Sequence, residues 1–278
     1  MLQLRGSIHT ATFTAMNKSF LIVGIAALLP SLAGASSSTW TESTGGAVRL
    51  VTSGLPDEDG VLRGALEIRL QPGWKTYWKE PGGSGIPPQL EFASGADVEG
   101  YQVHFPPPVR VDDEYGSWAG YQQSVALPVE IKFSDPSSRS VEGSFFLGIC
   151  ESVCIPFEGQ FAFDPAAEPE NFEHRVKVEG AFAKLAPEPS EGFQAVSARL
   201  EGRELRIAVD VPSGLEAPQL FVAVEGVPAN LPELHEQRAG RVEYIARLSR
   251  VPEPRPSSIY YTITGDGRAV SGYLALEE

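Results

Sequence analysis

The stretch Leu62–Leu70 (LRGALEIRL) decides the fold class of this chain. Apolar and polar residues alternate along it, which is the period-2 pattern of a β-strand with one buried face. The same pattern recurs on both sides of it, at 48–51, 74–78, 89–92, 125–133, 144–149 and 160–163. Turn signals such as Pro72-Gly73, Pro106-Pro107-Pro108 and Asp135-Pro136 separate these segments. The spacing is typical of a sandwich, so we predict a β-sandwich domain over residues 40–165.

Strand patterns resume in the last third of the chain. They cover 193–200, 204–211, 220–224, 242–248, 258–264 and 269–276. Gly265-Asp266-Gly267, between the last two segments, is a hairpin signal. We therefore predict a second β-sandwich domain over residues 193–278, in tandem with the first.

Residues 166–192 differ in character from both strand-rich parts. They contain one helical stretch, with Phe172, Val176, Phe182 and Ala183 near one face, and Pro187-Glu188-Pro189 ends it. This segment is predicted to be a short helix and linker between the two sandwich domains.

The composition agrees with a turn-rich β protein. Apolar residues make up 42% of the 278, which excludes wholesale disorder, and the chain has 28 Gly, 23 Pro and only two Met. Lys and Arg number 22 against 36 Asp and Glu, which gives a net charge of −14. This acidity argues against nucleic acid and against an anionic membrane surface as partners, because both select basic patches.

The amino-terminal segment has the features of a secretory signal peptide. Lys18 provides a positive start, Phe20 to Leu29 an apolar run and Ala33-Gly34-Ala35 a cleavage site. The apolar run is shorter than the roughly 20 residues that a membrane span needs. We predict a cleaved signal peptide over residues 1–35, with Met16 as an alternative start. The mature chain is expected in the periplasm of a bacterium, without a membrane span of its own and in an oxidising compartment.

The two cysteines, Cys150 and Cys154, lie four residues apart. On a straight strand their Cα atoms would be about 13 Å apart, whereas a disulfide needs about 7 Å or less. A bond between them therefore requires the chain to fold back, in a hairpin tip or a helical turn, and Pro156 fits the restart of an edge strand. So short a ring stabilises by only about 2 kcal/mol, which suits a bond that is made and broken. A structural disulfide is an equal alternative on spacing alone.

The sequence around the pair is acidic. Glu151 and Glu158 flank it, and no Lys, Arg or His lies between Arg139 and His174. Neighbouring carboxylates raise the pKa of a thiol. We therefore expect a disulfide that is attacked by a partner's thiolate, rather than a strongly activated nucleophile.

Several ordered motifs carry a family resemblance. Pro72–Lys79 (PGWKTYWK), Pro81–Pro88 (PGGSGIPP) and the C-x3-C-x-P segment resemble the periplasmic N-terminal domain of DsbD-type disulfide reductases, and the ScsB-like branch most of all. The resemblance covers about residues 45–190. It implies an immunoglobulin-like β-sandwich with a redox disulfide, which passes electrons from a membrane partner to periplasmic thioredoxin-fold proteins. The sequence contains neither the polytopic membrane domain nor the thioredoxin-like domain of DsbD-type proteins, so a separate membrane electron-transfer protein is the expected donor.

The resemblance also implies roles for single residues. Cys154 matches the cysteine that forms the mixed disulfide with partners, and Cys150 matches the one that resolves it. Asp113-Glu114-Tyr115-Gly116 resembles a cap loop over the disulfide. Tyr115 is the predicted shield and Trp118 the second choice, while Asp113 and Glu114 are expected to raise the pKa of the thiols.

Side-chain alternation places Trp74 and Trp78 on one face of their strand and Lys75 and Tyr77 on the other. If the tryptophans fill the core, Tyr77 is free to meet a partner. Tyr77 and Pro156 are therefore the predicted docking residues.

Other chemistries find less support in the sequence. His104, His174 and His235 are isolated and lack the spacing of metal ligands, so we predict no metal site and no cofactor. No nucleotide-binding or hydrolase motif is present. The leading prediction is a periplasmic thiol–disulfide exchange module that works through Cys150 and Cys154. The alternatives are a non-catalytic periplasmic binding or assembly protein with a structural disulfide, and a Cu(I)-binding copper-tolerance protein. Whether the chain is an enzyme stays open at this point.

Overall fold

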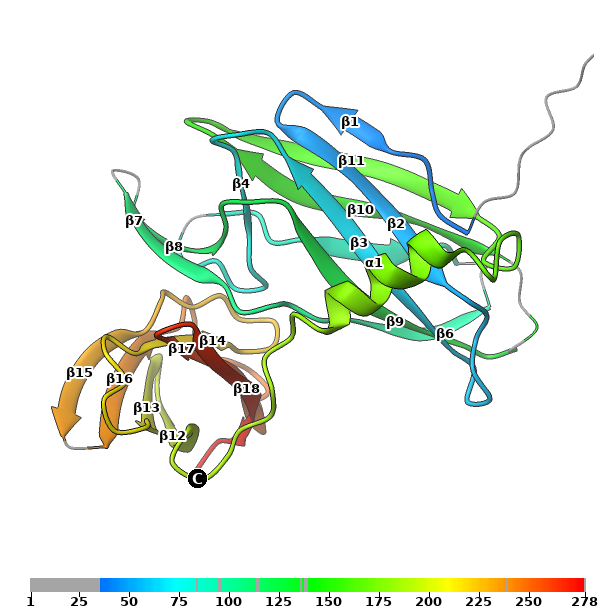
Figure 1. Cartoon of the computed structure of the whole chain (residues 1–278). Coiled ribbons are helices and arrows are strands. Elements are labelled where there is room, and N and C mark those ends of the chain that lie inside the picture. Colours follow the sequence, from blue (N-terminus) through cyan, green and yellow to red (C-terminus); the bar gives the residue numbers. More distant parts are fainter. Residues whose placement is uncertain are drawn as a thin grey trace, which may run out of the picture. The chain divides into compact units, whose positions relative to one another are not determined.

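The computed structural model describes residues 36–277, except 84, 95–96, 114–115, 136, 138–139 and 239. The predicted signal peptide therefore lies outside the described residues. The described part is nearly all β-structure, in two sandwiches that follow one another along the chain (Figure 1). The predicted all-β class is confirmed. The expected domain boundaries stay a prediction, although the strands of the first sandwich end at Phe163 and those of the second begin at Gln194.

The first sandwich has two antiparallel sheets. One has the order β1-β2-β3-β9-β6, and the other has the order β11-β10-β4-β8-β7, with β5 pairing to β10 as well. The strands are β1 (Thr41–Ser43), β2 (Gly46–Ser53), β3 (Val61–Leu70), β4 (Lys75–Tyr77), β5 (Gln89–Phe92), β6 (Val98–Val103), β7 (Val109–Asp113), β8 (Gly116–Tyr121), β9 (Val125–Phe133), β10 (Val141–Cys150) and β11 (Cys154–Phe163).

The core of this sandwich lies between its sheets. The alternation in β3 buries Leu62, Leu66 and Ile68 on one side, where they join Leu147 and Ile149 of β10 in one apolar cluster. Burial of such side chains stabilises the fold by about 1.5–3 kcal/mol each. The opposite face of β10 carries Phe146, which is exposed, and Cys150, which is buried against Tyr77 and Trp118.

The second sandwich has a four-stranded sheet, β12-β13-β16-β15, and a three-stranded one, β14-β17-β18. Its strands are β12 (Gln194–Glu201), β13 (Glu204–Asp210), β14 (Gln219–Ala223), β15 (Glu233–Arg238), β16 (Arg241–Arg247), β17 (Ser258–Gly265) and β18 (Arg268–Ala275). It has its own apolar cluster, which includes Ile207 and Ile263. Two of its residues, Phe221 and Leu231, instead belong to the cluster of the first sandwich. The rings of Phe221 and Trp78 meet there, with centroids 5.9 Å apart.

Helix α1 (Phe172–Phe182) lies between the sandwiches in the sequence, as predicted, but its predicted face is wrong. Phe172 and Val176 are 68% and 50% exposed, and the buried residues are His174, Val178 and Ala181. The reason is a polar contact that hydrophobic periodicity does not register. The Nδ1 atom of His174 lies 2.7 Å from the Oγ of buried Ser36, on the side of the helix where Val178 and Ala181 pack against Val51 and Ala65 of the sheet.

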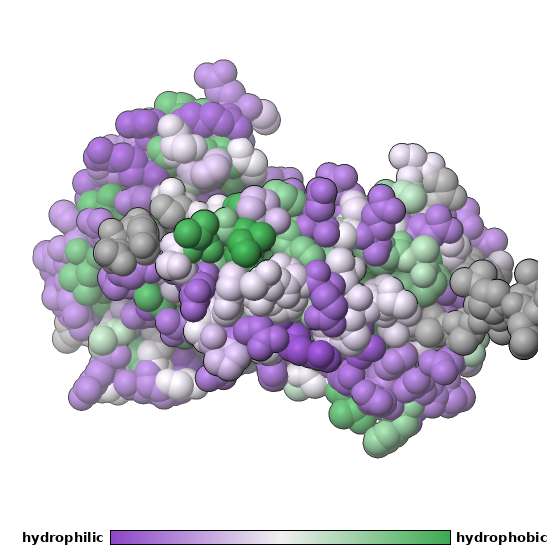
Figure 2. All heavy atoms as spheres, turned by 90° about the horizontal axis from the view of Figure 1, so that it is seen from above, coloured by the Kyte–Doolittle hydropathy of each residue, from purple (hydrophilic) through white to green (hydrophobic). Residues whose placement is uncertain are grey.

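One face of the described part of the chain is mostly polar. Figure 2 shows a face covered largely by hydrophilic residues, with hydrophobic ones in small separate groups. Isolated exposed apolar residues are normal for a soluble domain.

Candidate functional site

The hairpin of β10 and β11 carries the cysteines at its tip. Its register pairs Ile149 with Ile155 and Cys150 with Cys154, and a disulfide joins the two cysteines with 4.1 Å between their Cα atoms. The chain therefore folds back between them, in the first of the two ways that the spacing allows. Because β11 is the edge strand of its sheet, Pro156 also lies on an edge strand, as predicted, and it is exposed there.

The two halves of the disulfide differ in accessibility. Cys150 is 1% exposed and packs with Tyr77 and Trp118, whereas Cys154 is exposed. A thiol that approaches from solvent therefore meets Cys154 first. The roles that the resemblance implies for the two residues stay a prediction.

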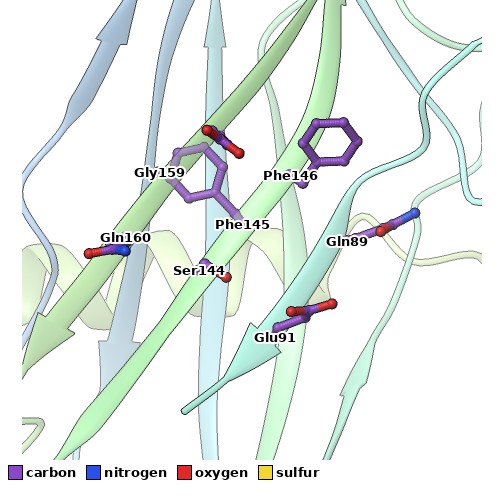
Figure 3. Close-up of a pocket in the computed structure, with 8 residues that line it drawn as sticks. Gln89, Glu91, Ser144, Phe145, Phe146, Gly159 and Gln160 are labelled. Atoms are coloured by element: carbon purple, nitrogen blue, oxygen red, sulfur yellow. The ribbon is translucent and has the colours of Figure 1, made fainter.

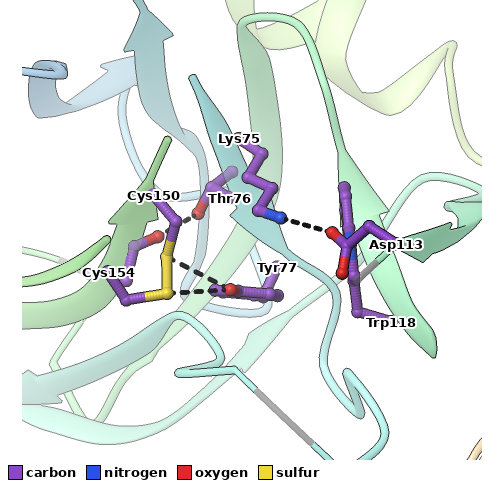
Figure 4. The surroundings of a disulfide bond; sticks show 8 residues. Lys75, Thr76, Tyr77, Asp113, Trp118, Cys150 and Cys154 are labelled. Atoms are coloured by element: carbon purple, nitrogen blue, oxygen red, sulfur yellow. Dashed lines mark hydrogen bonds and ion pairs between the residues drawn. A yellow bond between two sulfur atoms is a disulfide. The ribbon is translucent and has the colours of Figure 1, made fainter. Parts of the chain in front are cut away.

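Tyr77 closes the inner side of the disulfide. Its hydroxyl donates to the Sγ of Cys150 at 3.1 Å and lies 3.0 Å from the Sγ of Cys154 (Figure 4). Burial, followed by the charge of Asp113, raises the pKa of Tyr77, so the phenol keeps its proton. The side chain is only 3% exposed, so the expectation that Tyr77 is free to meet a partner is wrong. The strand alternation is as predicted, but the face opposite the tryptophans is covered by the disulfide.

Trp118 packs against Tyr77, and Asp113 in turn contacts Trp118. The Trp118 ring meets the Tyr77 ring edge-on, with centroids 5.9 Å apart, and its Nε1 donates to the Oδ2 of Asp113 at 2.8 Å. Trp118 is buried next to Cys150, so its ring lies beside the disulfide, and its role as a shield stays a prediction. The other two predicted cap residues, Glu114 and Tyr115, lie outside the described residues.

Lys75 is a site residue that the sequence analysis did not select. It is the register partner of Cys150, and its Nζ lies 3.0 Å from the Oδ2 of Asp113 and 4.4 Å from the centre of the Trp118 ring. Lys75 is a neighbour of Cys150 through strand pairing and not along the sequence, so the local charge pattern around the cysteines does not include it. The signal was present, since alternation already placed Lys75 on the same face as Tyr77. Because Lys75 pairs with Asp113, that carboxylate is not an isolated negative charge beside the sulfurs.

The Pro-Gly-rich loop after β4 is built to pack on Tyr77. Gly85 has a φ of +136°, and a Cβ there would lie 2.7 Å from the Tyr77 ring, so a larger residue does not fit without a shift. The carbonyl of Ile86 accepts from the N–H of Gly148 at 3.0 Å, which fastens the loop to β10. The motif at 81–88 therefore supports the disulfide from the side.

The histidines lie apart from the disulfide. His104 pairs with Glu130, His174 contacts Ser36, and His235 is exposed on β15. Among the residues that the structure describes, no group of three or more His, Cys, Asp or Glu side chains is arranged to hold a metal ion. No described helix is long and apolar enough to cross a membrane.

Comparisons with known proteins agree with this geometry. Residues 53–165 match the family described as thiol:disulfide interchange protein DsbD, N-terminal. The crystal structure of the N-terminal periplasmic domain of ScsB from Proteus mirabilis superposes with a TM-score of 0.70 at 22% identity, over 87% of this chain and 99% of that one. This likeness extends over both sandwiches, and it confirms the predicted fold class of two tandem immunoglobulin-like sandwiches.

Two more remote structures have TM-scores too low to support an argument. They are a conserved domain protein from Bacillus anthracis (TM-score 0.23, 10% identity, 88% and 92% coverage) and the titin Ig tandem domains A164-A165 (0.21, 9%, 87% and 98%). No curated protein matches the sequence.

Proposed function

We propose that this chain, whose residues 53–165 form a DsbD-type N-terminal domain, exchanges electrons with partner proteins through its Cys150–Cys154 disulfide. The resemblance read from the sequence is confirmed over these residues. A domain of this type with a disulfide at its hairpin tip supports thiol–disulfide exchange as the general chemistry. The residue roles, the partners and the direction of electron flow are the further content of the proposal.

Exchange in one direction begins at Cys154. A partner thiolate attacks the Sγ of Cys154, the bond to Cys150 breaks, and the electron pair leaves with the Cys150 sulfur, which then takes up a proton. A second thiol of the partner attacks the mixed disulfide, so that Cys154 is released as a thiol. The partner then holds a disulfide, and this chain has gained two electrons and two protons.

The reverse direction uses the same atoms. The Cys154 thiolate attacks the disulfide of an oxidised partner, and the Cys150 sulfur then attacks Cys154 and releases the reduced partner. In the first direction negative charge develops on the Cys150 sulfur as it leaves. In the reverse direction the Cys150 sulfur loses this charge when it attacks Cys154. The Tyr77 hydroxyl, 3.1 Å from that sulfur, is placed to donate a hydrogen bond to the thiolate.

The observation that carries the proposal is the accessibility of the two sulfurs: an exposed Cys154 joined to a buried Cys150 whose sulfur has a hydrogen-bond donor. A disulfide that serves only stability needs neither feature. We also propose a periplasmic location, thioredoxin-fold proteins as partners and a separate membrane protein as electron donor.

The first test is the reduction potential of the disulfide. We expect a value between about −270 and −120 mV when the protein is equilibrated in glutathione or dithiothreitol buffers and its free thiols are counted. A value well below about −300 mV marks a structural disulfide and overturns the proposal.

Trapping then tests the residue roles. Cys150→Ser leaves the exposed Cys154 and is expected to accumulate a mixed disulfide with an oxidised thioredoxin-fold protein. The matched variant Cys154→Ser leaves only the buried cysteine and is expected to trap little. Equal trapping by both variants contradicts the assignment of Cys154 as the attacking residue.

A further inference from the structure

A groove runs over β10 on the outer face of the first sandwich, between β5 and β11. Its cavity of about 560 Å³ is lined by side chains from the three strands (Figure 3). We call it the acidic groove and define it by Gln89, Glu91, Ser144, Phe146, Glu158 and Gln160. The small side chain of Ser144 forms its floor, with Glu91 on one neighbouring strand and Gln160 on the other.

The acidic groove and the disulfide lie on the same face of the sheet. Residues at even spacing along a strand point to one face, and Cys154, Pro156, Glu158 and Gln160 of β11 follow that spacing. All four are exposed. At about 3.3 Å per residue, Glu158 lies roughly 13 Å from Cys154 and Gln160 roughly 20 Å. An extended segment of a partner can therefore occupy the groove while a thiol of that partner reaches Cys154.

The charge of the groove is not balanced within the described part of the chain. Glu91 and Glu158 take part in none of its ion pairs, and neither does Glu151 at the hairpin tip. Phe146, which is 36% exposed, adds an aromatic surface between the carboxylates. Carboxylates beside an aromatic ring suit Lys and Arg side chains, whose stems lie on apolar surface and whose heads meet negative charge or a ring face.

The general chemistry of thiols indicates that the protein with the attacking cysteine is the one that carries such Lys and Arg side chains. Reactive cysteines usually sit in electropositive surroundings, because nearby cations stabilise the thiolate. A partner with a reactive thiol therefore tends to carry positive charge close to it. The acidic groove presents the opposite charge next to the disulfide that this thiol must reach, and complementary charge raises the rate of productive encounter.

From this arrangement we propose that the acidic groove docks an extended, basic segment of the thiol partner while the partner's thiolate meets Cys154. The inference rests on the proposed exchange function and names the surface that selects its partner. Docking speeds the attack on Cys154 by holding the thiol near it, and it requires no change in the disulfide itself.

The test uses synthetic peptides as thiol partners of the full chain. One peptide has a single cysteine followed by Lys at the fourth and sixth positions after it, and the matched peptide has Gln there. The rate constant for formation of the mixed disulfide between peptide and protein, which opens the Cys150–Cys154 bond, is measured by mass spectrometry of acid-quenched samples. We expect the Lys peptide to react about tenfold faster at low ionic strength, and this advantage to disappear in about 0.5 M salt. Glu91→Gln combined with Glu158→Gln is expected to remove most of the advantage.

A control variant separates docking from net charge. Glu58→Gln combined with Glu99→Gln removes two exposed carboxylates away from the groove, and it is expected to keep the Lys-peptide advantage. The proposal is overturned if both double variants lose it equally, or if the two peptides react at the same rate. It is also overturned if light scattering shows a concentration-dependent dimer that the groove variant abolishes, because a second copy then occupies the groove.

Dithiothreitol, a small uncharged thiol, distinguishes failure of the docking proposal from failure of the exchange function. Its rate with the groove variant is expected to equal its rate with the unchanged protein. If dithiothreitol reduces the disulfide readily but the peptides show no charge dependence, docking fails and exchange stands. If no thiol reduces the disulfide, the exchange function itself fails.

Discussion

The hydroxyl of Tyr77 is the atom on which the chemistry of the buried sulfur depends. It lies 3.1 Å from the Cys150 sulfur, in a site where Cys150 is almost fully covered. A hydrogen bond to a charged group is worth about 1.5–3 kcal/mol, and a thiolate that leaves in a covered site has few other donors. We therefore expect Tyr77→Phe to lower the rate constant of reduction by dithiothreitol about tenfold, measured by counting free thiols over time.

The matched control for this substitution is Tyr101→Phe. This substitution also removes one phenolic hydroxyl, which in the unchanged protein donates to the carbonyl of Leu90 on β5. Tyr101 itself lies on β6, in the sheet that does not hold the disulfide. Its variant is expected to react at the unchanged rate. An unchanged rate for Tyr77→Phe would instead mean that Tyr77 only packs against the sulfurs.

The buried carboxyl of Glu80 is expected to make the free energy of unfolding depend on pH. It is 8% exposed, and burial raises its pKa from 4.5 to about 7, although hydrogen bonds from the backbone of Ala229 and Gly82 lower it. Between these two pKa values the folded chain holds a proton that the unfolded chain has released. The free energy of unfolding therefore falls as the pH rises from about 4.5 to 7, by up to about 3 kcal/mol.

Glu80→Gln isolates this contribution, because glutamine stays neutral at every pH. We expect the variant to melt at a higher temperature than the unchanged protein at pH 8, and the difference to vanish near pH 5. Scanning calorimetry at both pH values measures it, with the exposed Glu99→Gln as the control that shows no such gap. If Glu80→Gln is the less stable protein at pH 8, the backbone donors outweigh the cost of burying the carboxylate.

At the scale of the element, the predictability of each strand follows from how much of it is buried. The half-buried strands β3, β9 and β13 alternate clearly in sequence and were predicted. Strand β15 (ELHEQR) is exposed along its whole length, so it has no apolar period to detect. Strands β7 and β8 were missed for a different reason, since short, polar or small residues next to a Pro-rich turn resemble a loop.

The candidate site was predictable where neighbours in the sequence are also neighbours in space. The spacing of Cys150 and Cys154 limited the local fold to two shapes, and the hairpin is one of them. Lys75 and the covered state of Tyr77 depend on which strands pair, and β4 comes from a part of the chain more than seventy residues earlier. Pairing between distant strands leaves no local pattern, so these features required the structure.

At the scale of the whole molecule, the second sandwich contains no cysteine, yet it supports the strand that holds Tyr77. The segment that follows β4 contacts it repeatedly: Trp78 meets Phe221, the Lys79 ammonium lies 4.3 Å from the centre of the Tyr260 ring, and Gly82 approaches Leu231. These contacts share one apolar cluster with the core of the first sandwich. We infer that the two sandwiches unfold together rather than one after the other.

The distribution of tryptophan makes this inference measurable. All four tryptophans (Trp40, Trp74, Trp78 and Trp118) precede the second sandwich in the sequence, so tryptophan fluorescence reports on the first sandwich and, through Trp78, on its contact with Phe221 of the second. Ile207 is fully buried in the separate cluster of the second sandwich. Ile207→Ala is expected to cost about 2–5 kcal/mol and, because unfolding is shared, to lower the urea midpoint seen by fluorescence as much as that seen by far-UV circular dichroism.

Two independent domains give a different result for the same variant. The fluorescence midpoint then stays in place while the circular dichroism trace splits into two steps, of which only one moves. Leu62→Ala, in the core of the first sandwich, is the matched control, because it must lower the fluorescence midpoint in either case. A shared transition means that the second sandwich stabilises the segment next to Tyr77, and that a partner which binds either sandwich also stabilises the strand beside the disulfide.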